Sequence, residues 1–167
     1  MERMMMDTNE LFCNGSSDEK APMPLPPGHA IVAVVLQSHG RIALLKRSQA
    51  IRHDRGLWHC ITGFVDAGIS SQAQAIQELR EETGLEEDDI LALKEGPELL
   101  LSDGKGDLWK VHTFAATTKA KDLCLNWEND SYLWTTRENV KLVPGRVLWL
   151  DTVLDATEWE PDPGQLR

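Results

Sequence analysis

Residues 63–85 read GFVDAGISSQAQAIQELREETGL, and this stretch decides the fold. From Ser71 to Thr83 the pattern predicts an α-helix. Ser71 and Gln74 form a capping-box pair at its start, and Gly84 stands where helices commonly end in a left-handed residue. The sequence therefore places one helix with defined ends in the middle of the chain.

Three glutamates share one side of this predicted helix. Because an α-helix turns by about 100° per residue, Glu78, Glu81 and Glu82 fall within about 100° of each other. A separate apolar stripe, centred about 115° away, contains Ala75, Ile76 and Leu79. Like charges at these spacings destabilise a helix by about 0.2–0.5 kcal/mol per pair. A bound Mg²⁺ or Mn²⁺, which prefers oxygen ligands, would offset that repulsion, and a solvated acidic face is the alternative explanation.

The whole stretch resembles the Nudix box. That family pattern is Gly, five residues, Glu, seven residues, Arg-Glu, an aliphatic residue, any residue, Glu-Glu, any residue, Gly and an aliphatic residue. The residues that match it in register are Gly63, Glu78, Leu79, Glu81, Glu82, Gly84 and Leu85. The resemblance extends over most of 29–156 and implies an α+β fold, a Nudix-like α/β/α sandwich with a mixed sheet between helices.

Two positions depart from the family pattern. Ile69 stands where the family has its first Glu, and Gln77 stands where it has Arg. The family's Arg is expected to orient a neighbouring glutamate through a charge-assisted hydrogen bond. Gln can also donate a hydrogen bond to that glutamate, but it carries no charge, so the bond is weaker. These departures leave the level of activity open.

The order of predicted elements agrees with the resemblance. Apolar and β-branched runs predict strands, and spacing of apolar residues every three to four positions predicts a second helix. The expected strands are 29–36, 41–47, 57–62, 91–101, 108–116 and 131–135, and the second helix is 146–156. We expect a folded domain over 29–157, a flexible proline-rich tail over 1–28 and a loose tail over 158–167.

The resemblance also implies a metal site and the residues that serve it. The Gly63 carbonyl, Glu78 and Glu82 would hold Mg²⁺ or Mn²⁺, with Glu81 as a further ligand or as a base. Members of this fold often recruit another glutamate from a later loop, and Glu128 is the candidate here, as general base or extra ligand. The alternative for Glu128 is an exposed loop acid. The catalytic group is thus Glu81, Glu82 and Glu128.

Substrate binding is assigned to basic and aromatic residues near the box. The segment 46–55 is a basic island in an acidic chain, and within it Arg47 and Arg55 are candidate phosphate ligands, because Arg grips phosphate with two parallel donors. Trp58 and Trp109 lie on predicted strands and are candidates for stacking on a nucleobase. Core packing is the alternative for both tryptophans.

The charge of the chain restricts its partners. A net charge of −10 and a pI of about 4.9 disfavour binding to nucleic-acid duplexes and anionic membranes. A small phosphorylated molecule, such as a nucleotide derivative, remains compatible if cations lie between the charges. The N-terminus lacks a long apolar run, so we expect neither a signal peptide nor a membrane span. We therefore expect a cytoplasmic protein. The family also implies a homodimer, although no interface is visible in the sequence.

These observations favour a metal-dependent hydrolase, a pyrophosphatase that cleaves a diphosphate bond in a nucleoside diphosphate linked to another group. The alternative is a catalytically weakened or inactive Nudix-fold module with a nucleotide-binding or regulatory role. The departures from the family pattern at Ile69 and Gln77 motivate this alternative. A third alternative, a Nudix-fold isomerase, would need a reactive cysteine, for which Cys60 is the candidate.

Overall fold

The structure, a computed structural model, describes residues 29–157. The predicted tails, 1–28 and 158–167, lie outside these residues. Within them no helix is long and apolar enough to cross a membrane. The elements are β1 (Ala30–Ser38), β2 (Arg41–Arg47), β3 (Trp58–His59), β4 (Ile61–Phe64), α2 (Ser71–Thr83), η1 (Glu87–Asp89), β5 (Ile90–Ser102), β6 (Leu108–Thr118), β7 (Asn129–Thr135), η2 (Glu138–Leu142) and α3 (Leu150–Ala156).

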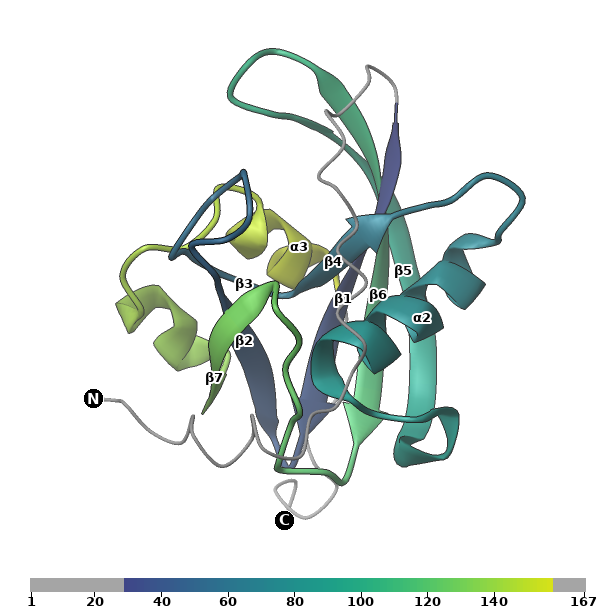
Figure 1. Cartoon of the computed structure of the whole chain (residues 1–167), viewed down its shortest axis with the longest axis vertical. Helices are drawn as coiled ribbons and strands as arrows, with labels where there is room; N and C mark the ends of the chain where they lie inside the picture. Colours follow the sequence, from purple (N-terminus) through teal and green to yellow (C-terminus); the bar gives the residue numbers. More distant parts are fainter. Residues whose placement is uncertain (1–28, 158–167) are drawn as a thin grey trace.

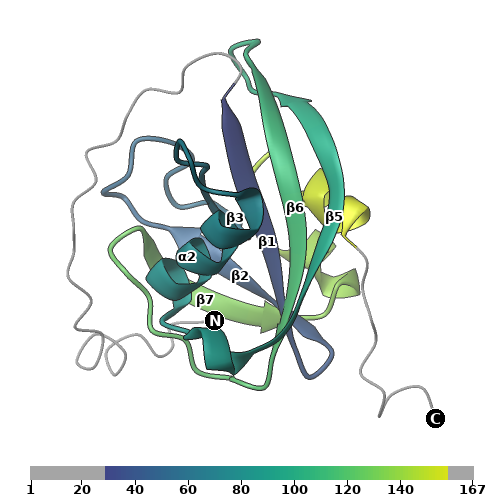
Figure 2. The same ribbon diagram turned by 90° about the vertical axis from the view of Figure 1, so that its right-hand side faces the viewer.

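A single mixed sheet forms the middle layer. Its strand order is β3-β2-β1-β6-β5, with β4 paired to β1 and β7 paired to β2. The β1–β6 pair is parallel, and the other strand pairs are antiparallel. Figures 1 and 2 show α2 on one face of the sheet and α3 on the other. The predicted α+β sandwich is confirmed.

The central strand β1 explains why both faces need a helix. Its side chains alternate between two apolar clusters, as expected for a strand buried on both faces. Val32, Val34 and Leu36 belong to the cluster that contains Ala75 and Leu79 of α2. The intervening residues belong to the cluster with α3: Ile31, Ala33, Val35, Leu150 and Val153. Each fully buried aliphatic side chain contributes about 1.5–3 kcal/mol, so these two layers hold α2 and its glutamates against the sheet.

Helix α2 has the predicted bounds but a different N-cap. The Ser70 hydroxyl, rather than that of Ser71, accepts the hydrogen bond from the Ala73 amide at 3.1 Å. The predicted Ser71–Gln74 capping box is therefore wrong, and the Gln74 side chain is free for another role. At the other end Gly84 has φ 74°, and a Cβ there would lie 2.7 Å from the Cys124 Cβ, so both conformation and space require glycine.

The second helix is shorter than predicted. It begins at Leu150, because the residues before it pair with β3 instead of coiling. The Trp58 amide donates to the Gly145 carbonyl at 2.8 Å, and the Val147 amide donates to the Trp58 carbonyl at 2.9 Å. The predicted strand 57–62 is likewise divided into β3 and β4. Helical spacing of apolar residues did not reveal this backbone pairing.

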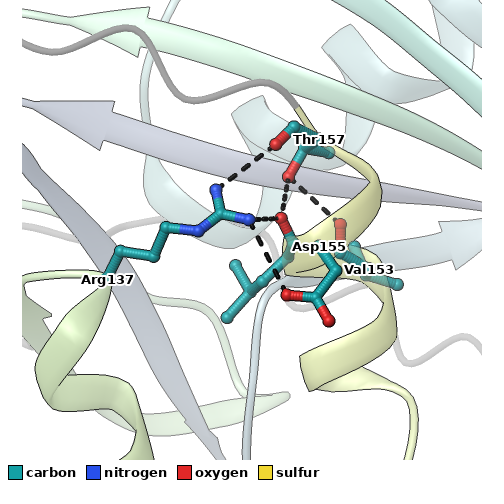
Figure 3. Close-up of polar contacts among 5 residues, drawn as sticks. Arg137, Val153, Asp155 and Thr157 are labelled. Atoms are coloured by element: carbon teal, nitrogen blue, oxygen red, sulfur yellow. Dashed lines mark hydrogen bonds and ion pairs between the residues drawn. The ribbon is translucent and has the colours of Figure 1, made fainter.

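Arg137 closes the C-terminal end of α3 (Figure 3). Its guanidinium donates to the Leu154 carbonyl and, at 3.3 Å, to the Thr157 carbonyl. A guanidinium nitrogen also lies 4.0 Å from an Asp155 carboxylate oxygen, but the Asp155 side chain is 86% exposed. The last carbonyls of a helix lack partners within it, and the Leu154 carbonyl is satisfied by Arg137 together with the Thr157 hydroxyl, which donates to it at 3.2 Å.

We expect Arg137→Ala to lower the free energy of unfolding by about 1–2 kcal/mol, since charged donors to carbonyls contribute at this scale when partly exposed. Asp155→Ala should change it by less than about 0.5 kcal/mol, because an exposed ion pair contributes little. Urea denaturation of both variants checks this. Equal losses in the two variants would contradict capping as the role of Arg137.

Candidate active site

Two of the three predicted glutamates point between α2 and the sheet. Glu78 is 4% exposed and Glu82 is 2% exposed, whereas Glu81 is half-buried. Buried carboxylates are rare unless they are paired or bind a cation. For Glu78 and Glu82 the structure therefore excludes the simpler interpretation as a solvated acidic helix face.

Glu78 lies against the backbone of β4. A Cβ built on Gly63 would fall 2.0 Å from the Glu78 carboxyl carbon, so only glycine leaves room for this side chain. The Gln74 amide nitrogen donates to Glu78 Oε1 at 2.8 Å, and Gln74 Oε1 accepts from the Asp66 amide at 3.1 Å. Sequence reasoning missed this role of Gln74, although its spacing of four residues from Glu78 places the two on one helix face.

Glu82 is a buried acid with a strongly perturbed pKa. Burial raises its pKa well above the usual value, the negative charges of Glu128 and Glu78 raise it further, and the charge of Arg47 and a hydrogen bond from the Thr62 amide oppose this. The Thr62 amide lies 3.3 Å from Glu82 Oε2. Charged side chains from three parts of the chain, α2, the end of β2 and the turn before β7, thus interact at Glu82.

Glu128 reaches the site from the turn before β7. The Ser48 amide donates to the Glu128 carbonyl at 2.8 Å, and the Glu128 amide donates to Asn126 Oδ1 at 3.1 Å. These bonds tie the turn to the end of β2, which carries Arg47. The charge of Glu128 acts on Glu82, so the structure places this predicted residue close enough to interact with the helix glutamates.

The two departures from the family pattern have different surroundings. Gln77 donates to Glu81 Oε1 at 2.9 Å, so an uncharged amide orients this glutamate. Ile69 is half-buried, and its amide donates to the Asp66 carbonyl at 3.2 Å within the loop before α2. Its side chain adds no ligand atom to the site.

The basic loop after β2 is anchored through its arginines. Arg47 Nε donates to the His53 carbonyl at 3.0 Å, and Arg55 Nε donates to the Ile51 carbonyl at 2.5 Å. The loop is closed by hydrogen bonds between the backbones of Arg47 and Gly56 and of Arg47 and Leu57. Arg47 acts electrostatically on Glu82, whereas Arg55 lies exposed on the loop.

The two predicted stacking tryptophans lie in different environments. Trp58 is half-buried and packs against the apolar cluster on the α3 side. Trp109 is fully buried, its ring contacts His29 and Phe64, and its indole nitrogen donates to Asp103 at 3.1 Å. Trp109 therefore presents no face to a ligand in this structure, and core packing is the correct interpretation for it.

A buried histidine and cysteine adjoin the site. Burial, aided by the charge of Arg47, lowers the pKa of His59 to about 3, so its ring is neutral at pH 7. Burial, with the charge of Glu82, raises the pKa of Cys60 to about 12. Because the thiolate is the reactive form of cysteine, Cys60 is a poor nucleophile, which disfavours the isomerase alternative.

The donor set fits a hard divalent cation. The negative charges of Glu78 and Glu128 both act on Glu82, and carboxylate oxygens are ligands that suit Mg²⁺ and Mn²⁺. Across 29–157 no three His, Cys, Asp or Glu side chains are already grouped as metal ligands. Instead N–H donors hold carboxylate oxygens individually, so binding would draw the carboxylates together.

Comparison with known proteins gives a consistent picture. The NUDIX domain family model matches residues 26–155, and no curated protein matches the sequence significantly. The MutT protein of Methanosarcina mazei Go1 has a similar structure, with a TM-score of 0.68 at 18% identity, covering 80% of this chain and 94% of that one. The NUDIX domain of Shewanella oneidensis NrtR, complexed with ADP ribose, has a TM-score of 0.64 at 18% sequence identity, and the match covers 90% of this chain and 96% of that one. A C. elegans Ap4A hydrolase has a TM-score of 0.61 at 19% sequence identity, and the match covers 76% of this chain and 93% of that one.

The perturbed acid predicts how stability changes with pH. The folded-state pKa of Glu82 lies above its ordinary value of 4.5, so the folded state retains a proton that the unfolded state releases as pH rises above that value. Stability is therefore lost with rising pH, by about 1.4 kcal/mol for each unit of pKa difference. We expect metal-free Glu82→Gln to be more stable than wild type at about pH 8 and equally stable at about pH 3.5.

Urea denaturation in the presence of EDTA at both pH values measures this difference. Glu87→Gln, which removes the same charge from an exposed position, is the control. A similar gain in stability from Glu87→Gln would mean that net charge rather than burial of Glu82 is responsible.

Proposed function

Because the chain belongs to the Nudix family, we propose that it is a metal-dependent hydrolase that cleaves a diphosphate bond in a nucleoside diphosphate linked to another group. The observation that carries this proposal is the buried Glu82, on which the charges of Glu128, Glu78 and Arg47 all act. A fold alone does not determine chemistry, so the argument rests on these side chains.

The acidic residues would hold Mg²⁺ or Mn²⁺. The proposed ligands are the Gly63 carbonyl, Glu78 and Glu82, with Glu81 completing the set. When bound, the cation neutralises charge on phosphoryl oxygens and lowers the pKa of bound water. The close approach of the Glu78 carboxyl group to the backbone at Gly63 supports this set.

Proton transfer is assigned to the acids around Glu82. Hydrolysis requires a group that takes a proton from the attacking water, and we assign Glu128 as this general base, with Glu81 as the second candidate. Glu128 comes from a turn whose backbone is fixed by Ser48 and Asn126, which holds a base in place on a loop.

Substrate phosphate would be bound by arginine side chains near the site. Arg47 adjoins Glu82, and Arg55 lies on the same loop. Arg suits this role since it offers several donors in a fixed plane. Trp58, which is half-buried, is the remaining aromatic candidate for contact with a base, and the proposed substrate is a small nucleotide derivative.

A binding or regulatory module is the second candidate function. It is favoured by Gln77 and Ile69, which leave the site with an uncharged donor to Glu81 and no carboxylate at the first position. The NrtR NUDIX domain was solved with ADP ribose, so ADP ribose is a suitable ligand for testing binding in this chain.

The primary test is product release from a panel of nucleotides and nucleotide conjugates with Mg²⁺ and with Mn²⁺. We expect metal-dependent turnover in wild type and a loss of about 10²-fold or more in Glu82→Gln, because removal of a charged ligand removes transition-state stabilisation. Turnover that survives Glu82→Gln would contradict the mechanism. Ligand binding by calorimetry without turnover in folded wild type would favour the second candidate.

Restoring the charge at position 77 should raise activity. Gln77→Arg would replace the neutral donor to Glu81 by a charged one, and charge-assisted bonds are roughly twice as strong, so we expect kcat to rise about 3–10-fold. Gln72→Arg, which adds the same charge at an exposed position of α2, is the control. An equal rise in both variants, or a fall in Gln77→Arg alone, would show that orientation of Glu81 does not limit turnover.

A further inference from the structure

Gln74 is a fully buried polar side chain on the sheet-facing side of α2. Its exposed fraction is 0%, like those of Ala75 and Leu79 on the same helix. Burying an amide is unfavourable when it lacks hydrogen bonds and close to neutral when it has them. An apolar residue would therefore serve packing at least as well, and the presence of Gln calls for another explanation.

Both ends of the Gln74 amide are used. Its nitrogen donates to Glu78 Oε1 at 2.8 Å, within a buried pair. Its oxygen accepts from the Asp66 amide at 3.1 Å, in the loop that leads from β4 into α2. The side chain thus links the loop backbone to a site carboxylate. The hydrogen bond from the Asp66 amide holds the Gln74 side chain in place, and this fixes the direction of its hydrogen bond to Glu78.

The Glu78 carboxyl group is confined on another side as well. The backbone of Gly63 approaches so closely that a Cβ would overlap the carboxyl carbon at 2.0 Å. Gly63 therefore fixes where the group lies, and the hydrogen bond from Gln74 fixes how it is rotated about its last bond. Together they hold the carboxyl group in one orientation.

The donor is also neutral, and this has a consequence for charge. A Lys or Arg in the same place would orient Glu78 but would cancel its charge and repel a cation. The amide orients the carboxylate and leaves its full charge available. Second-layer groups that hold a ligand in this way commonly change metal affinity by 10–100-fold.

We propose that Gln74 is a positioning residue that orients the Glu78 carboxylate for binding a divalent cation. The proposal rests on the proposed function, since it assigns Glu78 to the metal. It differs from a purely structural role, in which Gln74 would only fasten the loop at Asp66 to the helix and would leave metal affinity unchanged.

The experiment is titration of the metal-free full chain with Mn²⁺ by calorimetry. Gln74→Met keeps the length of the side chain and removes both hydrogen bonds, and we expect Mn²⁺ to bind about 10-fold more weakly or worse. Gln72→Met, at an exposed position of the same helix, is the matched control and should bind as wild type does. Gln74→Asn, which keeps the amide but shortens its reach, should also weaken binding and serves if the Met variant does not fold.

A double-mutant cycle separates positioning from structure. If Gln74 acts through Glu78, then Gln74→Met should weaken Mn²⁺ binding in wild type and have no further effect in a Glu78→Gln background. Equal weakening in both backgrounds, or wild-type affinity in folded Gln74→Met, would overturn the proposal and leave the hydrolase proposal standing. Wild type that binds no Mn²⁺ would overturn both. Weakened Mn²⁺ binding that obeys the cycle, in a protein without turnover, would support Gln74 and contradict hydrolysis.

Discussion

Burial of the Glu78 and Glu82 carboxylates between a helix and a sheet is the constraint on which the rest of the structure depends. Charged groups are expensive to bury unless each receives a compensating partner. Here the Gln74 amide and the Thr62 backbone amide provide donors, and Arg47 provides the opposing charge. The apolar clusters on both sides of β1 are what make such an arrangement stable.

The same constraint explains how distant parts of the chain are related. Glu128 comes from the turn before β7 and Arg47 from the end of β2, and β7 pairs with β2. Strand pairing therefore places a carboxylate, Glu128, and a guanidinium, Arg47, at one end of neighbouring strands, beside the helix that carries Glu82. The site is assembled by sheet topology as much as by the helix sequence.

Sequence reasoning succeeded where a local signal determines the structure. Helix α2 was predicted with its observed bounds, since Gly84 and the polar residues before the helix mark its ends, and Glu128 was placed near Glu82 through the resemblance to the family. It failed where contacts depend on how the elements pack together. Gln74 was interpreted as a cap because its contacts with Asp66 and Glu78 depend on packing, and burial of Trp109 depends on neighbours from other strands.

The burial of Cys60 has a consequence for redox chemistry. Oxidation to sulfenic acid begins from the thiolate, and because burial raises the pKa of Cys60 to about 12, the thiol form predominates at pH 7. Peroxide therefore has almost no reactive species to attack at this position, even though the sulfur adjoins the acidic site. Burial between the sheet and the helix, aided by the charge of Glu82, thus disfavours oxidation of this thiol.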